Sequence, residues 1–332
     1  FSSTGRVAQQ IDASAVARGG AVEGDEGLTA SGLFGVADGL YSRHALRRSV
    51  TGSTPVDWRA EREPHRRGEV LVRALMDTVM AMWQARMSHP GGRASTYQVA
   101  DAGARSGRQV LRMLIRGIGY TPPVDTTFAD LVRGILAADM AVIPDDEWDY
   151  RGVLRAAFAR LRIPVAADDG LDGLAGLRGL RYPIRLSSLG SDPEEVYRFL
   201  WENPTIQRAA ALDPDAPIVV ERVRPSQRVG PDGFVVTEIG ASFVQMVTLT
   251  QREARQRLGL RVTGPVVLRG GGLLRFDEGG RLSFAALKPV LDAERQQARF
   301  DESAGRTTVD QSPSTIAERR ADVFAHLHSP AS

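Results

Sequence analysis

Apolar residues recur at helical spacing through the first half of the chain. From Pro64 they follow one another over about six turns, and the stretch stops at Ser88-His89-Pro90-Gly91-Gly92, where proline and glycine end a helix. The same spacing predicts three further helices: residues 97–118, a segment entered through Thr126-Thr127-Phe128, and one that follows the acidic segment 144–149 and stops at Ile163-Pro164. We therefore expect residues 64–164 to form a compact bundle of four helices joined by short loops.

Polar residues at the starts of these helices fit capping roles. Thr126 or Thr127 is expected to cap the third helix, with Asp130 as the acid of a capping box. Asp145 or Asp146 is expected to cap the fourth helix, because carboxylates stabilise the positive end of a helix.

The second half of the chain has a different residue pattern, in which short runs of β-branched residues alternate with turns. A short helix is expected from Asp192 to Trp201 and another at 289–299. The expected strands are 218–223, 234–237, 244–249, 264–268, 273–276 and 281–284, and Asp277-Glu278-Gly279-Gly280 predicts a hairpin turn before the last of them. The fold class predicted for the whole chain is a mainly α bundle followed by an α+β domain with a small antiparallel sheet.

These patterns divide the chain into five parts. They are a loop-rich N-terminal segment at 1–60, a helical domain at 61–165, a linker at 166–190, an α+β accessory domain at 191–302 and a flexible tail at 303–332.

Composition removes several classes of function. The 332 residues contain no cysteine, which excludes thiol nucleophiles and cysteine-ligated zinc, and Lys288 is the only lysine among 42 basic residues. The formal net charge of +2 and the scattering of arginines among acids argue against a nucleic-acid partner. Uninterrupted apolar runs are too short for a membrane-spanning helix.

Among the five histidines, His65 has the most suggestive surroundings. It stands just before the long first helix, with Glu61, Glu63 and Glu69 near it in the sequence and Gly68 permitting close approach of a backbone or a substrate. Neighbouring carboxylates raise the pKa of an imidazole, which suits it to donate a hydrogen bond to a developing oxyanion. The alternative is an ordinary surface histidine beside acids that cap the helix.

Two other clusters have simpler explanations. The acids Asp139, Asp145, Asp146 and Asp149 offer oxygen ligands for calcium, but helix capping accounts for them without a metal. Gly270-Gly271-Gly272 follows a strand and precedes another strand, so we expect a bulge or a close approach of two backbones there instead of a phosphate-binding loop.

The helical half of the chain resembles the C-terminal helical region of thermolysin-like zinc metallopeptidases. The resemblance rests on Tyr120-Thr121-Pro122, on Thr126-Thr127-Phe128 leading to Ala137-Ala138-Asp139, and on the helix Val153–Ile163; His65-Arg66-Arg67-Gly68-Glu69-Val70 resembles the corresponding helix start of the fungalysin branch. It covers roughly residues 60–165. Arg162 stands where the family pattern has glycine, and the zinc-binding His-Glu-x-x-His helix is absent from this sequence.

The resemblance implies a role for His65 as the group that stabilises the tetrahedral oxyanion, oriented by Glu61. It also implies zinc in the intact protein, a peptide or protein substrate, and secretion. Because the chain begins at Phe1 without an initiator methionine, we expect it to be the C-terminal part of a longer peptidase, inactive by itself. The alternative is a non-catalytic scaffold or interaction module, in which the sheet of residues 191–302 binds a protein partner at its edge.

Overall fold

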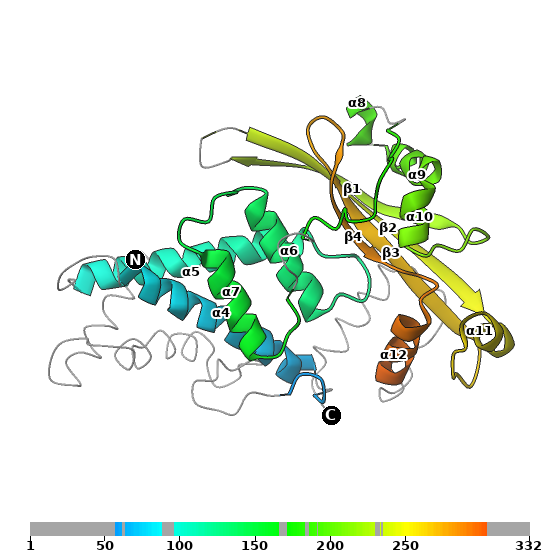
Figure 1. The fold of residues 1–332 in the computed structure, drawn as a ribbon, viewed down its shortest axis with the longest axis horizontal. Helices are drawn as coiled ribbons and strands as arrows, with labels where there is room; N and C mark the ends of the chain where they lie inside the picture. Colours follow the sequence, from blue (N-terminus) through cyan, green and yellow to red (C-terminus); the bar gives the residue numbers. More distant parts are fainter. Residues whose placement is uncertain are drawn as a thin grey trace, which may run out of the picture.

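The computed structural model describes residues 57–61, 64–87, 96–165, 171–182, 186–190, 192–229, 233 and 235–303 (Figure 1). The helices and strands in chain order are α4 (Pro64–Met87), α5 (Thr96–Ile118), α6 (Phe128–Met140), α7 (Tyr150–Arg160), α8 (Leu186–Leu189), α9 (Pro193–Glu202), α10 (Pro204–Ala209), β1 (Ile218–Val229), β2 (Val235–Leu249), α11 (Gln251–Leu258), β3 (Val266–Phe276), β4 (Leu282–Lys288) and α12 (Ala293–Ser303). We refer to α4–α7 as the helical region and to residues 192–303 as the sheet region.

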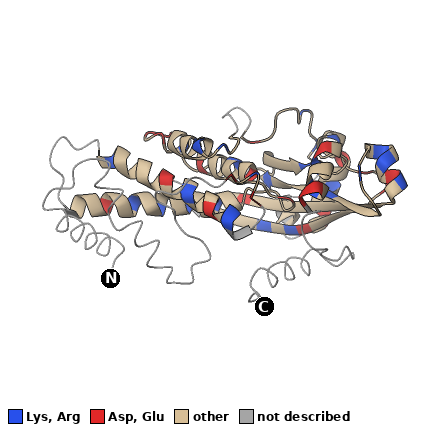
Figure 2. Cartoon of the chain, turned by 90° about the horizontal axis from the view of Figure 1, so that it is seen from below, with Lys and Arg blue, Asp and Glu red and all other residues tan. Residues whose placement is uncertain are grey.

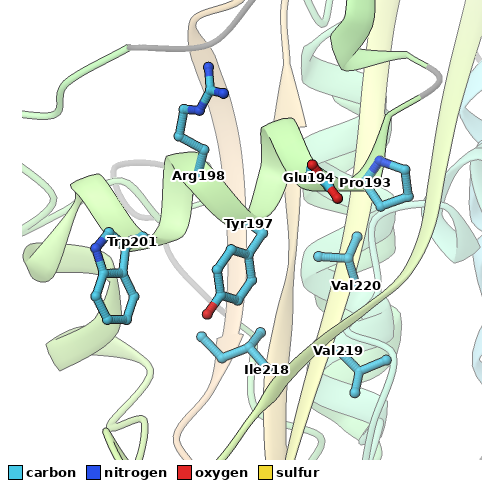
Figure 3. A pocket seen from close by; sticks show the side chains of 8 residues that line it. All are labelled: Pro193, Glu194, Tyr197, Arg198, Trp201, Ile218, Val219 and Val220. Carbon is cyan, nitrogen blue, oxygen red and sulfur yellow. The ribbon is translucent and has the colours of Figure 1, made fainter.

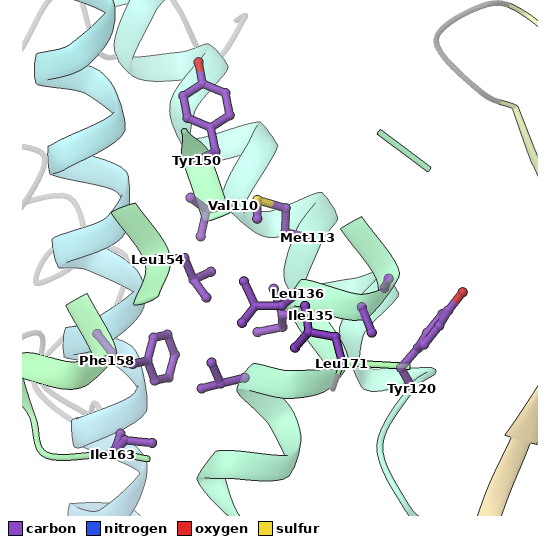
Figure 4. Packing of buried hydrophobic residues seen from close by; sticks show 14 of the residues in the cluster. Val110, Met113, Tyr120, Ile135, Leu136, Tyr150, Leu154, Phe158, Ile163 and Leu171 are labelled. Atoms are coloured by element: carbon purple, nitrogen blue, oxygen red, sulfur yellow. The ribbon is translucent and has the colours of Figure 1, made fainter. Parts of the chain in front are cut away.

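The four helices expected in the first half of the chain are confirmed as α4–α7. Helix α4 packs against α5 and α7, and α5 packs against α6. Their shared core contains fully buried side chains from all four helices, and Figure 4 shows Met113, Ile135, Leu136, Leu154 and Phe158 among them. Removing such side chains from water is the dominant stabilising term for a helical region of this kind.

The cap expected for α6 is present, whereas the cap expected for α7 at Asp145 or Asp146 is only partly confirmed. The Thr127 side chain accepts the backbone N–H of Asp130, and the Asp130 carboxylate accepts the backbone N–H of Thr127, which completes a capping box. At α7 the Asp146 carboxylate accepts the backbone N–H groups of Tyr150 and Arg151. Asp149 is the N-cap residue, with its side chain accepting from Gly152.

The sheet region contains one antiparallel sheet of four strands in the order β1-β2-β3-β4. The hairpin turn expected between Phe276 and Leu282 is confirmed, because the backbone N–H of Asp277 bonds to the carbonyl of Arg281 at 2.8 Å. A helical part followed by an α+β part with a small antiparallel sheet is thus the observed order of elements.

Six strands were expected and four are observed in the described part of the chain, because small residues inside two of them looked like interruptions. Residues 235–249 form one strand through Gly240, and residues 266–276 form one strand through Gly270-Gly271-Gly272. Strands β1 and β4 also continue to Val229 and Lys288, past the expected ends at 223 and 284. The three glycines at 270–272 allow neighbouring backbones to approach closely, as expected from the sequence. A Cβ on Gly270 would lie 2.4 Å from the carbonyl oxygen of Lys288, and one on Gly271 would lie 2.1 Å from that of Phe243.

Four helices were missed or misplaced in the second half. Helix α8 lies in the segment 166–190 that we expected to be a linker, and no helix was expected at α10 or α11. The last helix runs over Ala293–Ser303 instead of 289–299. Helix α11 is only eight residues long and has little apolar periodicity, but Thr250 and Glu253 form a capping box at its start.

The sheet is covered on both faces. On one face Leu273, Phe284 and Ala286 belong to the same core as the helices α4–α7. On the other face Leu274 and Phe276 pack with residues of α9 and α10, and Figure 1 shows these two helices on the opposite side of the sheet from α6. The apolar core of the helical region therefore continues into the sheet.

A buried polar network crosses the same boundary. The Arg275 guanidinium on β3 contacts the Glu238 carboxylate on β2 at 2.6 Å, and the Tyr120 hydroxyl donates to that carboxylate at 3.0 Å. Arg275 also donates to the carbonyl of Gly119 at 2.9 Å and lies 4.1 Å from the centre of the Tyr120 ring. A charge buried this deeply needs such partners, so the network fixes the loop after α5 against the sheet.

None of the described helices is both long enough and apolar enough to span a membrane.

Candidate functional site

The start of α4 carries the residues expected at a catalytic site. Glu61 precedes the helix, and its carboxylate lies 3.3 Å from the Nε of Arg66, with 17% of the Glu61 side chain exposed. His65 is the second residue of α4, but its side chain lies outside the described residues. Orientation of His65 by Glu61 therefore stays a prediction.

The approach to this helix start is held in place by the end of α7. The indole Nε1 of Trp58 donates to the carbonyl of Leu161 at 3.1 Å, and the Arg59 guanidinium donates to the carbonyl of Arg162 at 2.8 Å. The Trp58 ring also meets the ring of Phe128, the first residue of α6, edge-on with centroids 5.6 Å apart. Residues that lead into α4 are thus anchored to two other helices, which limits the freedom of its first turn.

The C-terminal end of α7 supplies those carbonyl groups through a Schellman turn. The backbone N–H of Arg162 bonds to the carbonyl of Ala159 at 2.8 Å, and that of Ile163 bonds to the carbonyl of Phe158 at 3.2 Å. Arg162 has φ of 57°, in the left-handed region that glycine normally occupies at this position. Arg162 therefore holds a backbone conformation that glycine adopts more readily than a residue with a side chain.

The sheet region also reaches the start of α4. The Arg67 guanidinium contacts the Glu302 carboxylate near the end of α12. Helix α12 is held in turn by Asp125, which precedes α6 and accepts from the Arg295 guanidinium at 2.8 Å. The first turn of α4 therefore contacts the last helix of the sheet region, and that helix is itself bound to the residue Asp125 before α6.

The acidic cluster between α6 and α7 serves mainly to hold a buried arginine. The Arg151 guanidinium lies 3.2 Å from Asp139 and 3.7 Å from Asp146, and it donates to the carbonyls of Ile143 and Pro144. Burial raises the pKa of the Asp139 carboxyl above its ordinary value, and the favourable interaction with Arg151 offsets only part of that shift. With Asp149 and Asp146 acting as caps, helix capping and ion pairing account for these acids.

The described residues do not fit a bound metal. None of their His, Asp and Glu side chains gather into a group of three or more that would ligate an ion. Within these described ranges there is therefore no ligand set for the zinc that the resemblance implies.

A second candidate site lies in the sheet region, between α9 and the start of β1. Eight residues line this open groove, which has a volume of about 830 Å³: Pro193, Glu194, Tyr197, Arg198, Trp201, Ile218, Val219 and Val220 (Figure 3). Tyr197 and Trp201 stack on each other along α9, with ring centroids 6.4 Å apart and an angle of 16° between the rings.

The lining of this groove was not foreseen as a site. Tyr197 and Trp201 are spaced i, i+4 on α9, which is ordinary for core residues, but 44% and 65% of these residues are exposed. Exposure cannot be recognised from spacing alone. The available signal was a pair of aromatic residues on the charged side of an amphipathic helix.

Neither candidate site lies in a large region of one charge. Acidic and basic side chains are interspersed along the described helices and strands (Figure 2). Particular pairs and unpaired charges therefore matter more than an overall field.

Comparison of the chain with protein-family models, with curated proteins and with solved structures gives no match.

Proposed function

We propose that this chain is the C-terminal part of a thermolysin-like zinc metallopeptidase, which hydrolyses peptide bonds in its intact form. The observation that supports the proposal is the set of four helices α4–α7, which lie over the same stretch, roughly residues 60–165, that carries the resemblance in the sequence. It includes the left-handed residue Arg162 in place of the family glycine. We infer that these helices form the four-helix bundle of such an enzyme.

The contribution of this chain to hydrolysis is to place His65. When the carbonyl of a peptide bond is attacked, negative charge develops on its oxygen, and a positioned hydrogen-bond donor stabilises that charge. His65 is this donor in our proposal. Trp58 and Arg59 are positioning residues, because they anchor the segment before α4 to carbonyl groups at the end of α7. Zinc would be held by residues other than those described.

The test is peptidase activity and metal content of the longest natural form of the protein. We expect bound zinc, activity that is lost on treatment with a chelator, and a decrease of about 10²–10³ in kcat for His65→Ala, the scale of losing one oxyanion donor. His89→Ala is the matched control, because the resemblance gives that histidine no role. An inactive, zinc-free full-length protein would refute the proposal.

The second candidate function is a non-catalytic interaction module. It is favoured by one observation, the exposed aromatic and aliphatic groove beside strand β1 at the edge of the sheet. The two candidates involve different parts of the molecule, so each can be tested without the other.

A further inference from the structure

Several large apolar side chains are exposed to solvent in the groove between α9 and β1. Trp201 is 65% exposed, Val219 is 53% exposed and Tyr197 is 44% exposed. All three line the same groove, in which Figure 3 shows Tyr197 above Ile218 and Trp201 beyond the start of the strand. Clustered exposed apolar groups of this kind mark interaction surfaces, whereas single exposed ones do not.

The floor of the groove is an open sheet edge. Strand β1 pairs only with β2 among the described strands. Its other side therefore presents backbone N–H and C=O groups, which are able to pair with an added strand. The edge is accessible over a short length, since the pairing of β1 with β2 shifts register between Val220 and Arg222 and Pro225 follows.

Beyond Trp201 the surface becomes positively charged. Trp201 also lines a second hollow, together with Arg181, Arg208 and the single acid Glu202. The Arg181 and Arg208 side chains are exposed, and no ion pair joins either of them to another described residue. Exposed guanidinium groups at the end of an apolar groove, with no ion pair to a described residue, favour a carboxylate ligand.

We propose that this groove binds an extended peptide segment that adds to the edge of β1, with apolar side chains against Tyr197 and Trp201 and acidic side chains beside Arg181 and Arg208. Antiparallel pairing with β1 places the C-terminal end of the segment at Trp201, because Figure 3 shows Val220 beside Pro193 and Trp201 beyond Ile218. The acidic residues therefore follow the apolar ones in the bound segment. This inference names a ligand for the second candidate function and does not depend on the peptidase proposal.

The experiment uses the full chain and a labelled peptide of about six residues that alternates valine and threonine and ends in two aspartates. We expect saturable binding by fluorescence anisotropy that weakens as salt is added. A peptide ending in two arginines, and one with proline in its centre, should each bind at least about tenfold more weakly.

Variants of the chain locate the binding. Trp201→Ala should weaken binding at least about tenfold, as loss of an aromatic anchor does, whereas Tyr97→Ala should leave it unchanged because Tyr97 is an exposed aromatic residue on α5. The double variant Arg181→Glu/Arg208→Glu should weaken binding of the acidic peptide and reverse its salt dependence, because added salt then screens a repulsion between like charges. Reversal of Arg252 and Arg255 on α11 is the matched control for charge.

Three results would overturn the inference. They are equal binding of the acidic and basic peptides, equal effects of Trp201→Ala and Tyr97→Ala, and a dimer in light scattering that is lost in Val219→Asp, which would make a second copy of the chain the occupant. Melting temperatures of all variants are measured alongside. Since the His65 assay reports on α4 and this one on β1, failure of either proposal is recognised separately.

Discussion

The helical region and the sheet region each bury an arginine, and they satisfy its charge in different ways. In the helical region Arg151 pairs with Asp139, only 12 residues away, and donates hydrogen bonds to two carbonyl groups of the loop between α6 and α7. In the sheet region Arg275 pairs with Glu238, 37 residues away, and reaches back 156 residues to the carbonyl of Gly119. One arginine stabilises a local turn, whereas the other joins the two regions.

This difference extends to the candidate sites. The start of α4 is surrounded by other elements: α6 and α7 anchor its approach, and Glu302 of α12 contacts its first turn. The groove at β1 is open and lacks such support, so it suits a ligand that brings its own strand. We infer that the helical region supplies rigid positioning and the sheet region supplies a binding surface.

The largest effect should come from breaking the network between the two regions. Arg275→Met leaves the Glu238 carboxylate buried without its guanidinium partner, and should lower the free energy of unfolding by about 3–5 kcal/mol. Replacing both residues, as Arg275→Met/Glu238→Met, should recover most of that loss because no buried charge is left. Urea denaturation measures both variants. If the double variant is no more stable than the single one, the network is not held together by its charges.

The pH dependence of stability tests whether burial or the ion pair with Arg151 dominates at Asp139. Because the pKa of Asp139 is raised above its ordinary value of 3.8, the folded chain holds that proton more tightly than the unfolded chain. The resulting contribution to stability is present below pH 3.8 and is lost as the pH rises through the raised pKa. The stability of the wild type relative to Asp139→Asn should therefore fall as the pH rises above 3.8. A relative stability that rises with pH would mean that Arg151 dominates over burial.

The smallest effect concerns the two helix ends that use a left-handed residue. Arg162 after α7 and Gly259 after α11 have φ of 57° and 66°. Arg162→Gly should stabilise the chain by about 1 kcal/mol, and Gly259→Ala should destabilise it by a similar amount, since a side chain is disfavoured in this conformation. A Cβ at Gly259 meets no atom within 4 Å, so the second variant reports on backbone conformation alone. Thermal unfolding measures both, and a loss of stability in Arg162→Gly would contradict the assignment.

The helical region could be predicted from the sequence better than the sheet region. The helices α4–α7 and the Thr127 capping box were predicted because their signals are local: apolar spacing, a capping residue and a terminating proline or glycine. The continuity of β3 through Gly270-Gly271-Gly272 was missed, because it depends on Lys288 and Phe243 approaching from neighbouring strands.

The candidate sites show a similar contrast. His65 was singled out from its neighbours in the sequence and from a family resemblance. The groove was missed, since it is formed by α9 and β1 packing side by side and since spacing does not reveal that Trp201 is exposed. The partners of Arg275 lie in three separate segments, which no pattern in the sequence connects.

The central claim is that His65 at the start of α4 stabilises a developing oxyanion. It is tested most directly by kcat and KM for His65→Ala and His89→Ala in the longest natural form of the protein, with melting temperatures measured for both. We predict a decrease of about 10²–10³ in kcat for His65→Ala with little change in KM or melting temperature, because the interaction is made only in the transition state. Equal kcat values for the two variants, or a loss in His65→Ala that follows a lowered melting temperature, would contradict the claim.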